Sequence, residues 1–252
     1  NVGQATPRIL TGRMAVATLA SGRKSTAALP LDRPKVSAAF DRLYSNNDAL
    51  SQTYREGQAA RQALLSDLKD PELEQKMANN GAASPYGFAK DAQRVAQVMA
   101  RDSRVQLAFM ALGGWDTHVN QGSANGQLAR NLQQLGRGIV ALQQGLGPVY
   151  ANTTILVMSE FGRTVHENGN GGTDHGHGNA MWVLGGGVRG GKVYGEWPGL
   201  ATAQLYQGRD LAVTTDFRDV VATVLGDRFG LDGAQLSQVF PRFQPSQRLT
   251  IV

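Results

Sequence analysis

The sequence LARNLQQLGRGIVALQQGL at residues 128–146 precedes the apolar run TTILVMS at residues 153–159. In the first segment, leucine and isoleucine recur at the alternating four- and three-residue spacing of an amphipathic helix. The second segment is short and continuously apolar, which is typical of a strand buried on both faces. Together they predict a helix followed by a buried strand.

Two further apolar segments flank this pair. Residues 105–112 are followed by Gly113 and Gly114, and AMWVL at residues 180–184 is followed by three glycines. We interpret both segments as strands, so that strands and helices alternate from residue 105 onward. That order predicts an α/β fold with a mostly parallel sheet flanked by helices.

The first part of the chain has helical periodicity. Residues 35–68 are expected to form two helices, the second capped by Asn47, and a short strand is expected at residues 14–19. Ser84 and Pro85 form an N-cap and first-turn pair, which predicts a helix ending near residue 100.

These elements give two regions that we expect to form one compact domain. Residues 1–104 comprise a basic irregular segment and a helical region, and residues 105–252 comprise the α/β region. Within the latter, Asp216 is expected to cap a helix through Phe229, with Phe217 facing inward.

Composition excludes several classes of protein. The chain has 252 residues, a formal charge of +5 and no cysteine, so disulfides, zinc–thiolate sites and cysteine nucleophiles are excluded. No apolar run is long enough to span a membrane. The basic segment 1–33 is consistent with nucleic-acid binding or with a solvated edge. Because it has no lysine or arginine block and no interleaved aromatic residues, we do not expect nucleic acid as a partner.

All four histidines lie between residues 118 and 177. The first is in GGWDTH at residues 113–118, just after a predicted strand, at the edge where α/β sheets bind ligands. In an extended segment Asp116 and His118 point the same way, and oxygen and nitrogen ligands together suit zinc, manganese or iron. A turn-capping aspartate beside a surface histidine explains the motif equally well.

The second cluster is SEFGRT at residues 159–164. Glu160 follows an apolar run, where an unpaired buried carboxylate would be costly. Metal ligation resolves this cost, and so does a salt bridge with Arg163. Arg163 is also suited to clamp a tetrahedral anion. Ser159 does not lie in a nucleophile elbow, so we do not expect it to be a nucleophile.

The third cluster, GTDHGHG at residues 172–178, is the most specific motif of the chain. Asp174, His175 and His177 lie among glycines that permit tight turns and close approach to a metal. The alternative is a glycine-rich loop in which these side chains only form hydrogen bonds. His166 has no such neighbours and is interpreted as a loop or outer residue.

Taken in order, these motifs resemble the bacterial family labelled domain of unknown function 1501, strongly over residues 105–230 and loosely over residues 1–104. The motifs that carry the resemblance are GGWDTH, the leucine-rich helix, ILVMSEFGRT, NGNGGTDHGHG and TDFRDV. The family is placed in the alkaline-phosphatase-like superfamily, with phosphatases, sulfatases and cofactor-independent phosphoglycerate mutase.

The resemblance implies a ligand set for one or two divalent metals, most simply zinc or manganese. Asp116 and His118 resemble a ligand pair at a strand end, and Glu160 stands where relatives have the aspartate of an Asp-His-Gly motif. Phe161 replaces the histidine of that motif, which departs from a two-metal site. Three residues resemble the later histidine ligand: Asp174, His175 and His177.

The resemblance also implies a function and a location. It predicts a metal-dependent hydrolase of phosphate or sulfate esters, acting on a small anionic ester or its polymer, with twin-arginine export to the periplasm. The superfamily's nucleophile and first metal-binding aspartate would lie upstream of Asn1. We therefore expect that a separate polypeptide supplies the N-terminal part of the domain, or that this chain is a cleaved or partial product. The alternative is a non-catalytic binding or assembly module that retains the fold.

Overall fold

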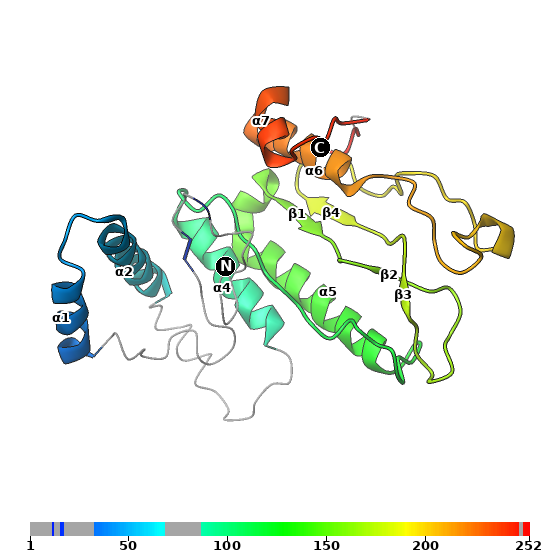
Figure 1. The fold of residues 1–252 in the computed structure, drawn as a ribbon, viewed down its shortest axis with the longest axis horizontal. Helices are drawn as coiled ribbons and strands as arrows, with labels where there is room; N and C mark the ends of the chain where they lie inside the picture. Colours follow the sequence, from blue (N-terminus) through cyan, green and yellow to red (C-terminus); the bar gives the residue numbers. More distant parts are fainter. Residues whose placement is uncertain (1–11, 13–15, 18–32, 69–86, 247–248) are drawn as a thin grey trace. The chain divides into compact units, whose positions relative to one another are not determined.

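A computed structural model describes residues 12, 16–17, 33–68, 87–246 and 249–252 (Figure 1). The chain divides into two compact units, residues 1–113 with 131–147 and residues 114–130 with 148–252. The expected strand at residues 14–19 lies largely outside the described residues. In the part of the chain that is described, no helix is both long and apolar enough to cross a membrane.

The described elements of the first unit are helices, and they confirm the helical periodicity. They are α1 (Pro34–Leu43), α2 (Ala49–Leu68), α4 (Phe88–Arg101) and most of α5 (Gln127–Leu146). Asp48 rather than Asn47 caps α2, because its Oδ1 accepts a hydrogen bond of 2.8 Å from the Ser51 backbone N–H. Gly87 is the N-cap of α4, whereas Ser84 and Pro85 lie outside the described residues.

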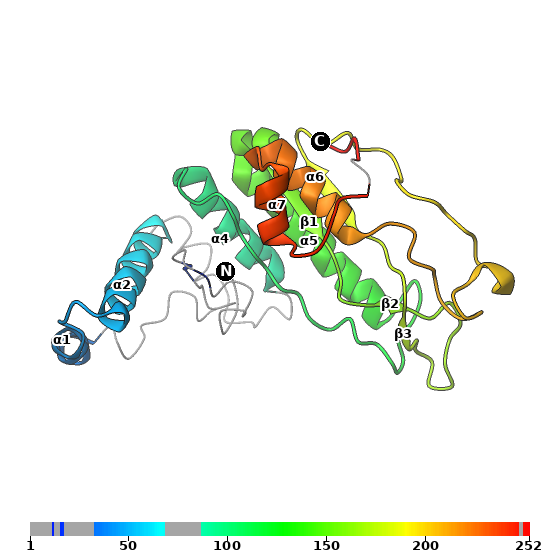
Figure 2. The ribbon, with the colours of Figure 1, turned by 45° about the horizontal axis from the view of Figure 1, so that its top comes forward.

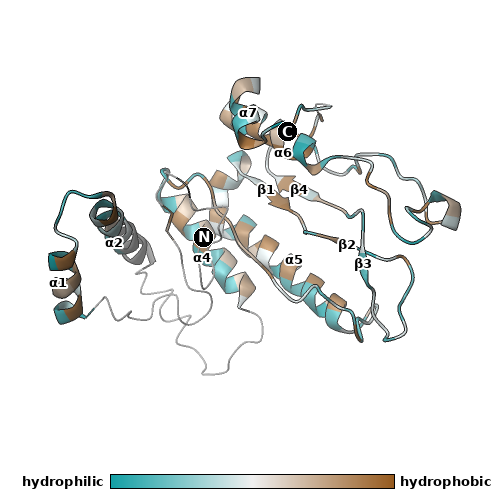
Figure 3. Cartoon of the chain, viewed as in Figure 1, coloured by the Kyte–Doolittle hydropathy of each residue, from teal (hydrophilic) through white to brown (hydrophobic). Residues whose placement is uncertain are grey.

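The core of the first unit lies between α4 and α5. Val95 and Val98 are buried there, and Leu142 of α5 packs against them. Both helices have an apolar and a polar face (Figure 3). Gly145 permits close approach, because a Cβ at that position would lie 2.7 Å from the Cβ of Ala96. Apolar burial and small residues therefore hold this helix pair together.

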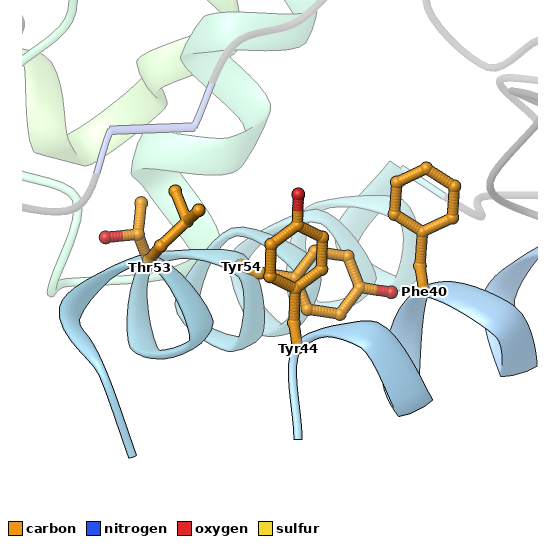
Figure 4. Close-up of a pocket in the computed structure, with 5 residues that line it drawn as sticks. Phe40, Tyr44, Thr53 and Tyr54 are labelled. Carbon is orange, nitrogen blue, oxygen red and sulfur yellow. The ribbon is translucent and has the colours of Figure 1, made fainter. Parts of the chain in front are cut away.

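A small aromatic pocket of about 250 Å³ lies at the α1–α2 corner of the same unit (Figure 4). The rings of Tyr44 and Tyr54 stack with their centroids 4.9 Å apart, and Tyr54 Oη donates to Asp41 Oδ1. Leu50 lines the pocket but is 64% exposed. The pocket is therefore a shallow hydrophobic corner rather than an enclosed cavity.

The second unit contains two short sheets, and both are antiparallel. β1 (Thr154–Val157) pairs with β4 (Trp182–Gly185), and β2 (Gly162–Arg163) pairs with β3 (His175–Gly176). The strands expected at residues 153–159 and 180–184 are thus present. The parallel pairing that we expected between successive strands is absent from the described residues, because β1 and β4 run in opposite directions. Apolar runs predict strands but carry no information on their relative direction.

The sequence predicts a strand at residues 105–112, and the structure does not contain it. The described chain has only a single bridge there, at Met110. Leu107 is 69% exposed and Phe109 is 39% exposed. An apolar run becomes a strand only when a neighbouring strand satisfies its backbone, and the sequence of the run does not show whether that neighbour exists.

α6 (Phe217–Phe229) is the helix expected after Asp216, whose side chain accepts a hydrogen bond from the Arg218 backbone N–H. α6 lies beside the β1–β4 sheet (Figures 1 and 2), and Arg228 Nε donates to Thr154 Oγ1 at 2.8 Å. Phe217 was expected to face inward, but it is 50% exposed. Its ring instead packs edge-on against Phe240, just after α7 (Gly233–Val239). The described residues also contain two 3-10 helices, η4 (Gly147–Asn152) and η5 (Thr202–Gln204).

Candidate metal centre

The β2–β3 hairpin presents one face with several functional side chains. Residues two apart in a strand point the same way, and Arg163 lies directly opposite His175 in the register. Phe161, two residues before Arg163, stacks on the His175 ring at 4.0 Å and 9°. The hairpin needs its glycines, because a Cβ on Gly162 would overlap the carbonyl oxygen of Gly178.

The segment that carries Asp116 and His118 is fixed against this hairpin by backbone and hydroxyl groups. The Thr173 N–H donates to the Thr117 carbonyl at 3.2 Å. The hydroxyls of both threonines donate to the same Gln121 Oε1, each at 2.7 Å. Both threonines are buried, which protects these bonds from water. Two segments that are far apart in sequence are thereby held side by side.

Three expected ligands come together in this arrangement. One ligand atom each from Asp116, His118 and His175 lies within 4.8 Å of the others. His175 Nε2 is 2.7 Å and His118 Nε2 is 3.0 Å from the same atom, Asp116 Oδ1. The two imidazoles stack at 4.9 Å. Their side chains are about half exposed, so a ligand can reach them from solvent.

Asp174 does not belong to this group, but it contacts the ring nitrogen of His118 that faces away from Asp116. His118 Nδ1 lies 2.9 Å from Asp174 Oδ1, and Asn168 Nδ2 donates to the same oxygen at 3.0 Å. These two contacts, that of His118 first, hold the pKa of the Asp174 carboxyl below its usual value. A carboxylate behind a histidine is the arrangement that commonly orients a metal-binding imidazole.

The carboxyl group of Asp116 is also held in its ionised form. The hydrogen bond with His175 has the largest effect in lowering its pKa, desolvation opposes it, and the hydrogen bond from Arg163 adds to the lowering. An ionised carboxylate is the form that binds a cation.

The donor set is chemically suited to a cation. His118 has both ring nitrogens about 3 Å from carboxylate oxygens. A neutral imidazole has only one N–H, so one nitrogen would face a carboxylate with its lone pair. Either a second proton or a bound cation removes this repulsion. If Asp116, His118 and His175 held a cation, His118 would be free to donate from Nδ1 to Asp174, as in many metal sites.

The other expected ligands lie elsewhere. Glu160 is exposed, and among the described residues it neither joins the group nor pairs with Arg163. His177 stacks on the Tyr206 ring at 4.0 Å instead. Arg163, the expected anion clamp, donates to Asp116 and to two backbone carbonyls. His166 is exposed in the loop, as interpreted from the sequence.

Sequence reasoning missed two residues of this site. Asn168 uses its Oδ1 to accept hydrogen bonds from the backbone N–H groups of Asn170 and Gly172, and its Nδ2 to hold Asp174. An asparagine before a glycine-rich turn is a recognisable signal for such a role. The sequence indicates only that Phe161 replaces a histidine ligand, whereas in the structure its ring packs on His175.

Comparison with known proteins identifies the family. The sequence model of the family described as "Protein of unknown function (DUF1501)" matches residues 11–240. The searches of curated proteins and of solved structures return no match. The match covers most of both compact units and all three residues of the candidate centre. The chain therefore belongs to the DUF1501 family.

Proposed function

We propose that this chain binds a divalent transition metal through Asp116, His118 and His175, and that it hydrolyses phosphate or sulfate esters at this site. The observation that carries the proposal is the convergence of the three ligand atoms within 4.8 Å from two distant segments. The support of His118 by Asp174 adds to it.

The ligands favour zinc or manganese. Two imidazoles and one carboxylate are the mixed nitrogen and oxygen donors that these ions accept. Three protein ligands also leave a coordination position for water or substrate, as catalytic sites require. The half-exposed side chains are consistent with an open position.

A hydrolase is the class that best joins this donor set to the family resemblance. The resemblance of the motifs to the alkaline-phosphatase-like superfamily extends the proposal to the fold and to anionic esters or their polymers as substrates. Export to the periplasm belongs to the same proposal. When bound, the metal would act as a Lewis acid and lower the pKa of a water molecule. The hydrogen bonds of Asp116 with His175 and Arg163 keep its carboxyl group ionised.

Metal binding and turnover test this proposal directly. We expect the purified chain to bind zinc or manganese with a stoichiometry near one by calorimetry, and His118→Ala or His175→Ala to abolish binding. His166→Ala and His177→Ala are matched controls, because both remove an exposed histidine outside the group. Hydrolysis of p-nitrophenyl phosphate or sulfate should disappear on chelation and return with the metal. Full metal content in His175→Ala would contradict the ligand assignment.

A specific observation favours a second function, a non-catalytic assembly module. The β1 strand is apolar along Ile155, Leu156 and Val157, yet all three are only half-buried in a two-stranded sheet. Strands of this composition are usually covered on both faces. A separate polypeptide that packs against the faces of this sheet would cover them. Metal binding without hydrolysis of either ester supports this second function, whereas metal-dependent turnover supports the first.

A further inference from the structure

The guanidinium of Arg163 is bonded to the backbone next to the metal-ligand segments. Nη1 donates to the Thr173 carbonyl and Nη2 to the Trp115 carbonyl, each at 2.5 Å. Nη2 also donates to Asp116 Oδ1 at 2.9 Å. Trp115 directly precedes Asp116, and Thr173 directly precedes Asp174. Two of the three bonds therefore act at or next to the ligand Asp116, and the third acts next to Asp174, which contacts the ligand His118.

These bonds leave Arg163 poorly suited to clamp a substrate anion. A guanidinium offers an anion two forks, and Nη2 takes part in both of them. Both protons of Nη2 are already donated, to Trp115 and to Asp116. The side chain is only 20% exposed, and its guanidinium lies 4.9 Å from the centre of the Phe161 ring. An ester could form a bidentate pair with Arg163 only by breaking a bond of Nη2 to Trp115 or to Asp116.

We propose that Arg163 is a positioning residue, which holds Asp116 against the two histidines and so sets the affinity of the centre for its metal. This inference rests on the proposed function, since it requires Asp116, His118 and His175 to be the ligands. It replaces the role of anion clamp that the sequence suggested.

Asp116 depends on Arg163 because its other contacts at the centre are with the ligands themselves. Its side chain is 61% exposed, and Oδ1 has three close neighbours, His118, His175 and Arg163. A cation held by Asp116, His118 and His175 would replace the two histidine contacts of Asp116. The contact with Arg163, which is not one of these ligands, would not need to change. Because Arg163 lies opposite His175 in the hairpin, the same two strands place both the ligand and its support.

The chain offers a matched control at Arg218. This residue also pairs with an aspartate, since its Nη2 lies 2.6 Å from Asp216 Oδ2. Its guanidinium also lies over a phenylalanine, 4.3 Å from the centre of the Phe243 ring. It contacts none of the three ligands. Arg218→Ala therefore removes the same kind of interactions while leaving the centre untouched.

The experiment compares Arg163→Ala, Arg163→Lys and Arg218→Ala in the full chain with Co²⁺ as the probe. We expect Arg163→Ala to weaken Co²⁺ binding by about 10- to 100-fold, as loss of an outer support typically does, and to change the visible absorption bands of the bound ion. Arg163→Lys should recover part of the affinity, because it restores the charge but not the bonds to both carbonyls. Arg218→Ala should bind like the wild type. Thermal melting is followed for each variant, and Arg163→Lys decides the test if Arg163→Ala does not fold.

Wild-type affinity and spectrum in both Arg163 variants would overturn the inference while leaving the metal centre intact. Unchanged affinity together with a raised KM for p-nitrophenyl phosphate would also overturn it and place Arg163 on the substrate. Failure of the wild type to bind Co²⁺, with zinc and manganese also unbound, would overturn the proposed centre and this inference together.

Discussion

The α4–α5 pair and the β2–β3 hairpin are built by different forces. Val95 and Val98 are buried in the helix pair and contact apolar neighbours from both helices. In the hairpin, His175 and Asp174 are exposed, and their positions depend on hydrogen bonds. Burial supplies most of the stability of a fold, whereas directed polar contacts supply geometry. We therefore expect changes in the helix pair to affect stability, and changes in the hairpin to affect metal binding.

The largest effect is expected at Gly172. A Cβ there would overlap the backbone carbonyl of His118, so Gly172→Ala must push the two ligand segments apart. Metal affinity should fall by at least about a hundredfold, or ~3 kcal/mol, in a calorimetric titration. Gly169→Ala in the same loop is the control, because no heavy atom lies within 4 Å of its added Cβ. Equal affinities in the two variants would show that the hairpin tolerates separation of its segments.

The second largest effect is expected on the stability of the α4–α5 pair. Val98 is 5% exposed, and Val98→Ala removes buried methyl groups from the core. We expect a loss of about 2 kcal/mol in the free energy of unfolding, measured by urea denaturation, with unchanged metal affinity. Val140→Ala on α5 removes the same groups from a side chain that is 49% exposed, and should cost much less. A change in metal affinity in Val98→Ala would break the contrast between the two regions.

A smaller effect is expected at Asp174. Asp174→Asn keeps the size of the side chain but removes the charge that faces His118 Nδ1. Metal affinity should fall about tenfold, while the melting temperature stays near that of the wild type because the side chain is exposed. Asp232→Asn, at the N-cap of α7, removes a carboxylate outside the centre and is the control. Similar metal affinities in both variants would argue against the outer role of Asp174.

The smallest effect concerns the pKa of Asp174 in the metal-free protein. Its folded-state pKa is lowered by His118 and then by Asn168. The resulting stabilisation is present above the unfolded-state pKa and is lost as the pH falls through the folded-state pKa. His118→Ala should raise the pKa of Asp174 toward its ordinary value in a carboxyl-carbon NMR titration. The pKa of Asp102, lowered by Arg104, should not change.

Much of the secondary structure followed from sequence patterns. The spacing of apolar residues predicted α5, and the N-cap at Asp216 predicted α6, because both signals are local. The prediction of a strand at residues 105–112 was wrong, because strand formation depends on a partner strand from elsewhere in the chain. The prediction that Phe217 is buried was wrong, because helical periodicity identifies the apolar face of a helix but not what covers that face.

The structure brings together only some of the metal ligands that the sequence predicts. Asp116, His118 and His175 come together, whereas Glu160 and His177 do not. The sequence does not separate His175 from His177, whereas in the structure His175 contacts Asp116 and His177 stacks on Tyr206. Asp174 and Arg163 were expected to act on the metal or the anion, and the structure gives them bonds to the ligands and their backbone instead.

The sequence alone determined which residue types were available for metal binding, and which segments are helical, because both depend on nearest neighbours along the chain. Tertiary structure decided which histidine faces Asp116 and which way the strands run. It also decided that Arg163 is bonded to Asp116 and to the carbonyls of Trp115 and Thr173. These depend on contacts between segments some fifty residues apart, such as that of Arg163 with Asp116, and no local pattern encodes the direction from which a distant segment approaches.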